Sequence, residues 1–572
     1  MALVMPARPR PGRHRLEPEV VPAPREQRSG RRAAVGRVVS VLAFLLVYLA
    51  LVAPNEFGQV VPGAFLRIPA EALVGVLLVL VLPGRARSAL ALVGGAVLGL
   101  LTVVRVLDMG FMTALARPFD PVFDWGQLLA AVPLFESSMG EIGAVAAAVG
   151  IGLSAVALVA LIALATLRLS RLVERHRTAA ARAVPVVGVA WLVCFGIGAQ
   201  IVVPVPVAAL STVSLAQRTA VQVPTTLRDY QAFLDQAARP DPFAGTPAAE
   251  LLSGLRGKDV VLSFVESYGR SAVEHPEIAP RVNAALDGGT DRLAAAGYSA
   301  RSAFLTSPVI GGGSWLAHAT LLSGLWVTNE QSYRTLVDGE RLTLTSAFER
   351  ADWRTVGVMP GVTRDWPEGE FYGIEQLYDY RNLGYAGEKF SGFHTPDQYT
   401  LSAFERFEHG ADRGPLMAEI PLVTSHWPWA PLPPTVDWDQ IGDGSVYDTL
   451  PDAGLPVEDV WGGDPGLVKD AYARSVEYSL TSLISWVERY GDDDLVLVFL
   501  GDHQPAPVAT GEGAGRDVPI TVVTRDRAVL DRIAGWGWDE GLRPGPQAPV
   551  SRMDTFRDQF LTAFGPEAHR AQ

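Results

Sequence analysis

Residues 495–503 read LVLVFLGDH, six apolar side chains followed by a glycine, an acid and a histidine. An uninterrupted apolar run of this length is typical of a strand that is buried on both faces of a mostly parallel sheet. Four further short runs, near-continuously apolar and rich in β-branched residues, alternate with helical patterns, at 260–265, 354–359, 420–424 and 520–524. The sequence therefore predicts an α/β domain with a mostly parallel sheet over residues 257–572.

Polar side chains follow several of these runs directly. Glu266 follows the run at 260–265, Asp502 and His503 follow the run at 495–500, and the loop SHWPW at 425–429 follows a third run. Because ligands bind at the carboxyl ends of strands in such sheets, we expect these side chains to meet at one edge.

A serine stands where a glycine-rich turn gives way to a helical pattern, in GGGSWLAHATLLSG at 311–324. The first N–H groups of a helix lack partners within the helix, so an anion can bind there, close to the hydroxyl of Ser314. His318 follows one turn later, on the same helix face. A serine at this position is also a common helix cap, so Ser314 becomes a candidate nucleophile only in combination with other residues.

That combination is a set of four donors: the carboxylates of Glu266 and Asp502, the imidazole of His503 and the hydroxyl of Ser314. An acid beside a histidine after a buried strand is costly unless both have partners. Such oxygen and nitrogen donors suit Mn²⁺, Mg²⁺ or Zn²⁺. We predict one divalent ion at this site, with Mn²⁺ as the first choice.

The N-terminal third contains apolar runs of membrane-spanning length. They lie at 35–53, 66–83, 89–107, 142–167 and 184–203. A run of about 20 apolar residues can cross a bilayer as a helix. The pattern predicts five transmembrane helices in a domain over 34–204, followed by a connector at 205–256 with a helix at 226–238. The second span is the weakest of the five, because Arg67 and Glu71 stand at its start.

Arginines indicate the orientation of this domain. They crowd a tail at 1–33, which we predict to be disordered, the turn with Arg85 and Arg87, and the loop at 168–182. Basic segments stay on the cytoplasmic side, so five spans place the N-terminus inside and the C-terminal domain outside. The expected location is the cytoplasmic membrane.

Composition excludes other classes of protein. The 572 residues carry a formal net charge of −13, which argues against a nucleic-acid partner. The single cysteine, Cys194, lies in an apolar run, so neither a disulfide framework nor a cysteine metal site is expected.

The order of these motifs resembles the sulfatase branch of the alkaline phosphatase superfamily, above all membrane proteins of the lipoteichoic acid synthase, or phosphoglycerol transferase, type. The resemblance implies that Glu266, Asp502 and His503 are metal ligands. It places Ser314 where that family has a threonine nucleophile that also binds the metal. It also implies that His426 contacts the phosphate of the substrate.

Departures from the family patterns bear on the reaction. The sulfatase motif Cys-x-Pro-x-Arg has Ser314, Leu316 and His318 here, so a formylglycine cofactor is not expected. The segment at 359–361 lacks the histidine of the synthases, and the segment at 366–368 has an acid in place of an arginine. Arg364 is the candidate replacement for that arginine.

The sequence thus predicts a metal-dependent phosphotransferase or phosphohydrolase that acts on a lipid-linked or cell-envelope phosphate ester. Ser314 is the expected nucleophile, His426 and His318 are the further catalytic candidates, and Arg364 and Trp427 are expected to bind substrate. Two alternatives are a sulfatase without formylglycine and a catalytically inactive protein that binds an envelope polymer.

Overall fold

The computed structural model describes residues 25–55, 60–115, 117–130, 132–202, 205–390, 395–410, 413–461, 464–511 and 513–566. The chain divides into two compact units. The first comprises residues 1–53, 61–103 and 150–213, and the second comprises 54–60, 104–149 and 214–572.

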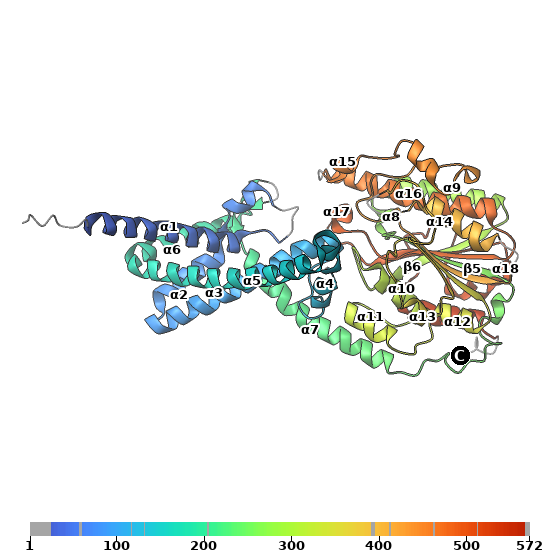
Figure 1. Cartoon of the computed structure of the whole chain (residues 1–572), viewed down its shortest axis with the longest axis horizontal. Coiled ribbons are helices and arrows are strands. Elements are labelled where there is room, and N and C mark those ends of the chain that lie inside the picture. Colours follow the sequence, from blue (N-terminus) through green and yellow to red (C-terminus); the bar gives the residue numbers. More distant parts are fainter. Residues whose placement is uncertain are drawn as a thin grey trace, which may run out of the picture. The chain divides into compact units, whose positions relative to one another are not determined.

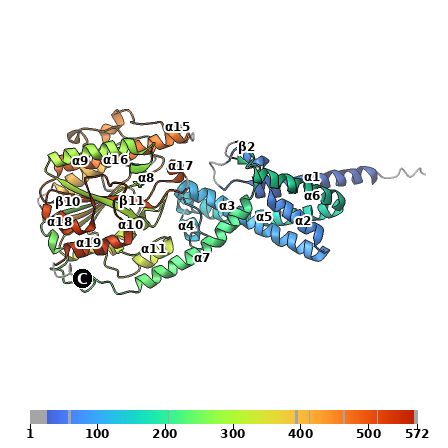
Figure 2. The same cartoon turned by 180° about the vertical axis from the view of Figure 1, so that it is seen from behind.

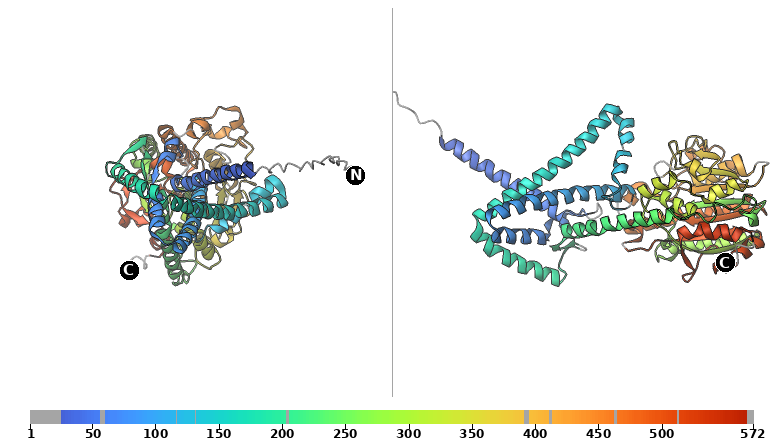
Figure 3. Two further views of the ribbon diagram at one scale, coloured as in Figure 1. Left: turned by 90° about the vertical axis from the view of Figure 1, so that its left-hand side faces the viewer. Right: turned by 90° about the horizontal axis from the view of Figure 1, so that it is seen from below.

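The first unit is built from long apolar helices (Figure 3). They are α1 (Arg25–Val52), α6 (Arg177–Gly196) and the parts of α3 (Gly84–Leu115) and α5 (Val132–Arg175) that fall at residues 84–103 and 150–175. Within the described part of the chain, these four helices are long and apolar enough to cross a membrane. Many of their leucines and valines are exposed, including Leu45, Val93, Leu153 and Leu192, as is usual for side chains that face lipid.

The predicted second span is a short helix, α2 (Ala70–Val81). Its 12 residues extend about 18 Å, whereas the hydrocarbon core of a bilayer is about 30 Å thick. The apolar run starts earlier than the helix because its first residues form other structure, including β1 (Ile68–Pro69), which pairs with β4 (Ala208–Ala209). The prediction of five spanning helices is therefore not confirmed, since four helices have the required length.

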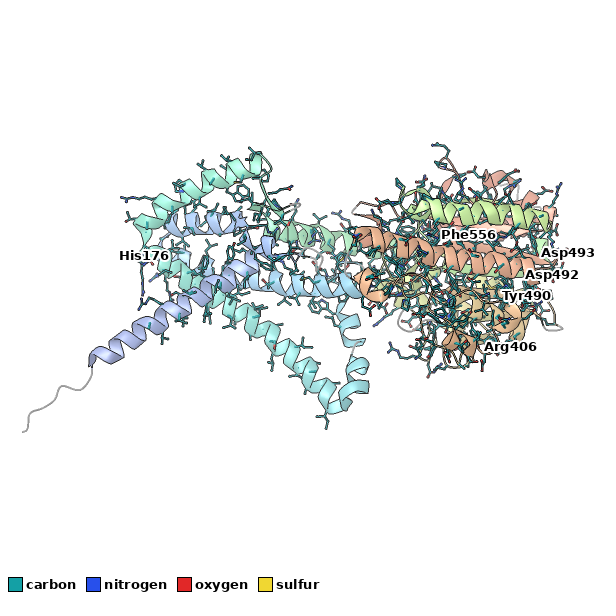
Figure 4. All side chains as sticks on the ribbon, turned by 90° about the horizontal axis from the view of Figure 1, so that it is seen from above. His176, Arg406, Tyr490, Asp492, Asp493 and Phe556 are labelled. Atoms are coloured by element: carbon teal, nitrogen blue, oxygen red, sulfur yellow. The ribbon has the colours of Figure 1, made fainter. Side chains whose placement is uncertain are left out.

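Hydrogen bonds place the two ends of α2 at opposite ends of this unit. Arg177, just after His176 in the turn between α5 and α6, donates to the carbonyl of Leu80 at 2.7 Å (Figure 4 labels His176). At the other end, Glu71 accepts from the backbone N–H of Thr212 at 3.1 Å. Two further contacts lie near the end with the α5–α6 turn, where the arginines gather. Arg87 pairs with Glu174, and Arg168 donates to the carbonyl of Gly36.

Two helices extend beyond the sequence predictions. Helix α1 begins at Arg25, inside the segment predicted as a disordered tail, while residues 1–24 lie outside the described residues. Helix α7 (Ser211–Ala237) includes most of the helix predicted in the connector and begins 15 residues earlier.

The second unit contains a nine-stranded sheet in the order β12-β6-β11-β10-β5-β9-β7-β8, with β13 beside β6. The strands are β5 (Asp259–Val265), β6 (Ser299–Thr306), β7 (Arg354–Met359), β8 (Gln376–Asp379), β9 (Leu416–Leu422), β10 (Leu495–Gly501), β11 (Asp517–Thr524), β12 (Asp539–Glu540) and β13 (Val550–Arg552).

The sheet is mixed, so the prediction of a mostly parallel sheet is not confirmed. Strands β10, β5, β9, β7 and β8 are parallel to their neighbours in that series. Strand β11 is antiparallel to both β10 and β6, and β12 is antiparallel to β6. In its described residues the segment between β10 and β11 contains one helix, the four-residue α17 (Pro507–Thr510), whereas a parallel connection usually contains a longer crossover helix.

Helices cover both faces of the sheet (Figures 1 and 2). One layer contains α9 (Ala279–Ala295), α14 (Asp397–Phe404) and α16 (Pro465–Tyr490). The other contains α10 (Ser314–Ser323), α11 (Glu330–Val337), α12 (Leu344–Arg350) and α19 (Phe556–Phe564). A separate apolar core fills each side, and every residue of β5 and β10 is buried.

Four parallel strands, β10, β5, β9 and β7, lie side by side in this order. Their carboxyl ends therefore share one edge of the sheet. Asp502 follows β10, Glu266 follows β5, the loop with His426 follows β9 and the loop with Arg364 follows β7. Strand β9 begins at Leu416 and ends at Leu422, earlier than the run predicted at 420–424.

Candidate active site

Ser314 is the first residue of α10. Gly313, immediately before it, has a φ of 86°, a left-handed conformation that favours glycine and lets the helix begin abruptly. The Oγ of Ser314 donates a hydrogen bond of 2.8 Å to Oε2 of Glu266 and lies 3.3 Å from Nε2 of His503. The sequence predicted that these residues lie at the same site, but it did not predict the individual contacts.

Glu266, Asp502 and His503 lie together beneath this hydroxyl. The Nε2 atom of His503 is 3.4 Å from Oε1 of Glu266 and 3.5 Å from Oδ2 of Asp502. All three side chains are buried, and each offers one ligand atom within 4.8 Å of the others. The structure thus brings together all four residues predicted to hold a metal.

Neighbouring backbone groups fix the orientation of this cluster. The Nδ1–H of His503 donates to the carbonyl of Gln504 at 2.8 Å, which leaves Nε2 toward the carboxylates. Oδ1 of Asp502 accepts from the N–H groups of Ser267 and His503, each at 2.7 Å. Such supporting contacts are typical of metal ligands. Ser267 adopts a left-handed backbone conformation, with a φ of 56°.

Without a cation, burial and mutual interaction shift the pKa values of the two carboxyl groups and the imidazole in this cluster. Burial raises the pKa of Asp502 to about 6, and the nearby charge of Glu266 adds to the rise. Burial also opposes ionisation of Glu266, but the positive charges of His503 and His426 bring its pKa down to about 2. Burial lowers the pKa of His503, yet the two carboxylates outweigh it and leave that pKa raised.

The donor set fits a divalent ion. Among the described residues, Oδ2 of Asp502 is buried and has no hydrogen-bond partner. A buried carboxylate oxygen without a partner is costly, and a cation at this point would satisfy it. Two carboxylates, an imidazole nitrogen and a hydroxyl are ligands that Mn²⁺, Mg²⁺ and Zn²⁺ all accept.

His318 lies one helical turn beyond Ser314. Its Nδ1 is 3.0 Å from Oε1 of Glu419, in the interior of β9, and its ring stacks on Phe264 with a centroid distance of 3.6 Å. The charge of His318 lowers the pKa of Asp502, after the larger effects of burial, Glu266 and His503. His318 is therefore close to the cluster but separate from the four donors.

His426 and Trp427 lie on the loop after β9. The Nδ1–H of His426 donates to the carbonyl of Trp427 at 2.7 Å, and the side chain of His426 is exposed. Trp427 packs edge-on against the buried Trp429, with ring centroids 4.8 Å apart. Since the charge of His426 acts on the pKa of Glu266, this loop lies near the cluster.

Arg364 is exposed on the loop after β7, at the same edge of the sheet. The next residue, Asp365, forms an ion pair of 2.5 Å with Arg381. The assignment of Arg364 to substrate binding stays a prediction.

A second group of possible metal ligands lies at the opposite edge of the sheet and consists of Asp259, His409 and Asp492. Asp492 is near the amino end of β10 (Figure 4). Asp259 already accepts two hydrogen bonds of 2.9 Å from Arg413. An arginine so close would repel a metal ion, so this group is better explained as an ion-pair network.

Two contributors to the site were not predicted from the sequence. Ser267 donates its hydroxyl hydrogen to Oε1 of Glu266 at 2.9 Å, and Glu419 pairs with His318. Glu419 interrupts the apolar residues Leu416, Met417, Ala418 and Ile420. A lone acid inside a buried strand requires a partner, and that was the signal available for Glu419.

No protein-family model matches the chain, and no curated protein matches it. Similar solved structures include the lipoteichoic acid synthase LtaP from Listeria monocytogenes, with 16% identity and a TM-score of 0.36, covering 55% of this chain and 76% of that one. A protein in the alkaline phosphatase superfamily from Vibrio parahaemolyticus has 14% identity and a TM-score of 0.32, covering 53% and 69%. The Streptococcus pyogenes phosphoglycerol transferase GacH, in complex with sn-glycerol-1-phosphate, has 13% identity and a TM-score of 0.32, covering 59% and 90%.

At these identities and TM-scores the likeness is distant.

Proposed function

We propose that this protein is a metal-dependent phosphotransferase or phosphohydrolase that uses Ser314 as its nucleophile. One observation carries the proposal: the Ser314 hydroxyl, at the start of a helix, contacts Glu266 and His503 beside a buried oxygen of Asp502 that has no hydrogen-bond partner in the described parts of the chain. A hydroxyl among metal donors at a helix N-terminus is suited to attack a bound anion.

Glu266, Asp502, His503 and Ser314 would hold the metal ion. A divalent ion bound there lowers the pKa of the serine hydroxyl and neutralises negative charge on a phosphate. We propose Mn²⁺, with Mg²⁺ or Zn²⁺ as alternatives. The remaining chemistry belongs to side chains and backbone groups of the chain itself.

In the first step, Ser314 Oγ forms a bond to phosphorus as the bond from phosphorus to the leaving oxygen breaks. The hydroxyl proton leaves to water, since Glu266, with a pKa of about 2, is a weak base and would also hold the metal ion. The first N–H groups of α10 stabilise the charge that develops on the phosphate oxygens. The product of this step is a phosphate ester of Ser314.

His426 is the proposed acid and base for the other proton. Its Nδ1–H is engaged by a backbone carbonyl, so Nε2 is the atom that exchanges a proton with substrate. His426 protonates the leaving oxygen in the first step and accepts the proton of the incoming alcohol or water in the second. Its exposure suits a residue that meets an acceptor arriving from solvent.

The substrate we propose is a lipid-linked or cell-envelope phosphate ester. LtaP is named as a lipoteichoic acid synthase and GacH as a phosphoglycerol transferase, and both names are consistent with such a substrate. Arg364 and Trp427 are the proposed substrate contacts. Ser314 stands where sulfatases carry a modified cysteine, which disfavours a sulfate ester.

We further propose that the catalytic domain, residues 257–572, lies outside the cytoplasmic membrane, joined by the connector at 205–256 to the membrane domain at 34–204. In this proposal α2, which at about 18 Å is too short to span the hydrocarbon core by itself, still carries the chain from one end of the first unit to the other, as its contacts at both ends support. The arginines at 85–87 and 168–182 then stay inside.

The test is mass spectrometry of the purified full-length protein after incubation with Mn²⁺ and membrane phospholipids. We expect a phosphate-containing adduct on the peptide with Ser314, and its mass identifies the transferred group. Ser314→Ala should show no adduct and lose turnover by more than about 10³-fold.

Ser332→Ala is the matched control, because Ser332 is a buried serine on α11 whose hydroxyl lacks a hydrogen-bond partner among the described residues. An adduct that persists in Ser314→Ala would contradict the assignment of the nucleophile.

A further inference from the structure

Glu419 lies in the middle of β9, opposite Leu262 of β5 and Gly357 of β7. Its side chain is on the same face of the strand as Met417, in the core next to α10, and only 1% of its surface is exposed. A carboxylate in such surroundings is strongly disfavoured unless it has a charged partner. The partner here is His318, at 3.0 Å.

The imidazole of His318 is held on two sides. One ring face stacks on Phe264, with 12° between the ring planes, and the Nδ1 atom meets Glu419. Phe264 comes two residues before Glu266, and His318 is one turn after Ser314. Because Nδ1 is engaged, Nε2 is the ring nitrogen that can meet a substrate. The side chain is 16% exposed, so it reaches an accessible surface.

We propose that Glu419 is a positioning residue, which fixes the imidazole of His318 so that its Nε2–H donates to the phosphate that reacts at Ser314. The inference rests on the proposed function. No bond forms or breaks at either residue, and no proton is transferred. The Nδ1–H of His318 donates to the carboxylate of Glu419, which leaves Nε2–H to donate to the phosphate.

A purely structural role explains the pair less well. Replacing a buried ion pair by apolar side chains of similar size is often neutral or stabilising, so packing alone does not require it. The charge pair also sits one helical turn from the candidate nucleophile.

The first test measures turnover of bis(4-nitrophenyl) phosphate by the full-length protein with Mn²⁺. His318→Gln should lower kcat by about 10²-fold, the usual loss when a donor to the transition state is removed. Glu419→Gln should lower kcat by roughly 10- to 100-fold, as for other supporting residues, with little change in KM. The double variant should be no slower than His318→Gln alone.

Multiplied losses in the double variant would overturn the inference, because Glu419 would then act independently of His318. The matched control is Glu408→Gln. Glu408 is also buried, but it pairs with Arg354 at the opposite edge of the sheet. It should leave kcat within about twofold of the parent value, as expected for a residue remote from the site.

The second test does not depend on activity. In the ¹H–¹⁵N spectrum of ¹⁵N-histidine-labelled protein, we expect a downfield Nδ1–H signal that is absent in His318→Gln and shifts upfield in Glu419→Leu. Absence of this signal, or its persistence unshifted in Glu419→Leu, overturns the inference. A protein that keeps the signal but forms no Ser314 adduct and has no turnover contradicts the proposed function, while the orientation of His318 by Glu419 stands.

Discussion

Asp502→Asn should have opposite effects on the metal-free and the metal-loaded protein. In the metal-free protein, Asp502 and Glu266 are two buried carboxylates that repel each other. Asparagine keeps an oxygen for the N–H groups of Ser267 and His503, and it replaces the unpartnered Oδ2 by an NH₂ group that can donate to Glu266. We therefore expect the variant to be more stable than the parent without metal.

The size of the effect follows from the pKa of Asp502. Burial and Glu266 raise that pKa from 3.8 to about 6, a difference of about two pH units. Each unit corresponds to about 1.4 kcal/mol, so the ionised carboxylate costs about 3 kcal/mol of folding free energy above pH 6. Since a raised carboxyl pKa favours the protonated folded state, this cost grows from pH 3.8 to 6 and is nearly absent at pH 4.

The assay is thermal unfolding of the purified full-length protein in EDTA and in excess Mn²⁺, at pH 4 and pH 7.5. In EDTA at pH 7.5 the variant should melt several degrees above the parent, and at pH 4 the two should nearly coincide. In Mn²⁺ the parent should gain more stability than the variant, because the variant has lost a charged ligand.

Asp397→Asn is the matched control. Burial also raises the pKa of Asp397 to about 6, but its contacts are with Ser479 and with the N–H groups of Val423 and Thr424. Its effect should be the same with and without Mn²⁺. The reasoning is refuted if Asp502→Asn destabilises the metal-free protein at pH 7.5, or if it stabilises equally at pH 4.

Four further predictions concern the metal, the orientation and the reaction. His503→Ala should remove the bound metal, and full occupancy by elemental analysis would reject His503 as a ligand. A reporter fused after Gln572 should be active outside the membrane and one fused after Arg87 inside; a cytoplasmic C-terminal reporter would exclude an envelope substrate. The protein should cleave an aryl phosphodiester faster than the matched aryl sulfate, and the reverse order of rates would favour a sulfatase. Ser314→Cys should not acquire sulfatase activity, because the proline and arginine of the sulfatase motif are absent.

Local sequence patterns located most of the central strands and the four candidate metal donors. The run before Asp502 is continuously apolar and the run before Glu266 contains one serine, so the sequence predicted that both strands are buried on both faces. The glycines before Ser314 likewise fixed the start of α10, because a left-handed residue is needed there. The meeting of these segments at one edge followed from the parallel pairing of β10 and β5.

Structural features that depend on contacts between distant segments were predicted less accurately from the sequence. Strand β9 starts at Leu416 rather than at the predicted residue 420 and includes Glu419, whose partner His318 comes from α10, 101 residues away in the sequence. The antiparallel direction of β11 was also not predicted, since it depends on the connection between β10 and β11. The second span was overestimated because the sequence did not show where α2 begins.

The sequence by itself determined which residue types are available for the chemistry and which segments are buried, because hydrophobic periodicity and glycine conformations are local properties. Only the tertiary structure decided the distances: the 2.8 Å contact of Ser314 with Glu266, the unpartnered oxygen of Asp502, and the pairing of His318 with Glu419. These depend on the register between strands and on the placement of α10 against the sheet. That placement follows from the packing of a whole core, so no single stretch of sequence contains it.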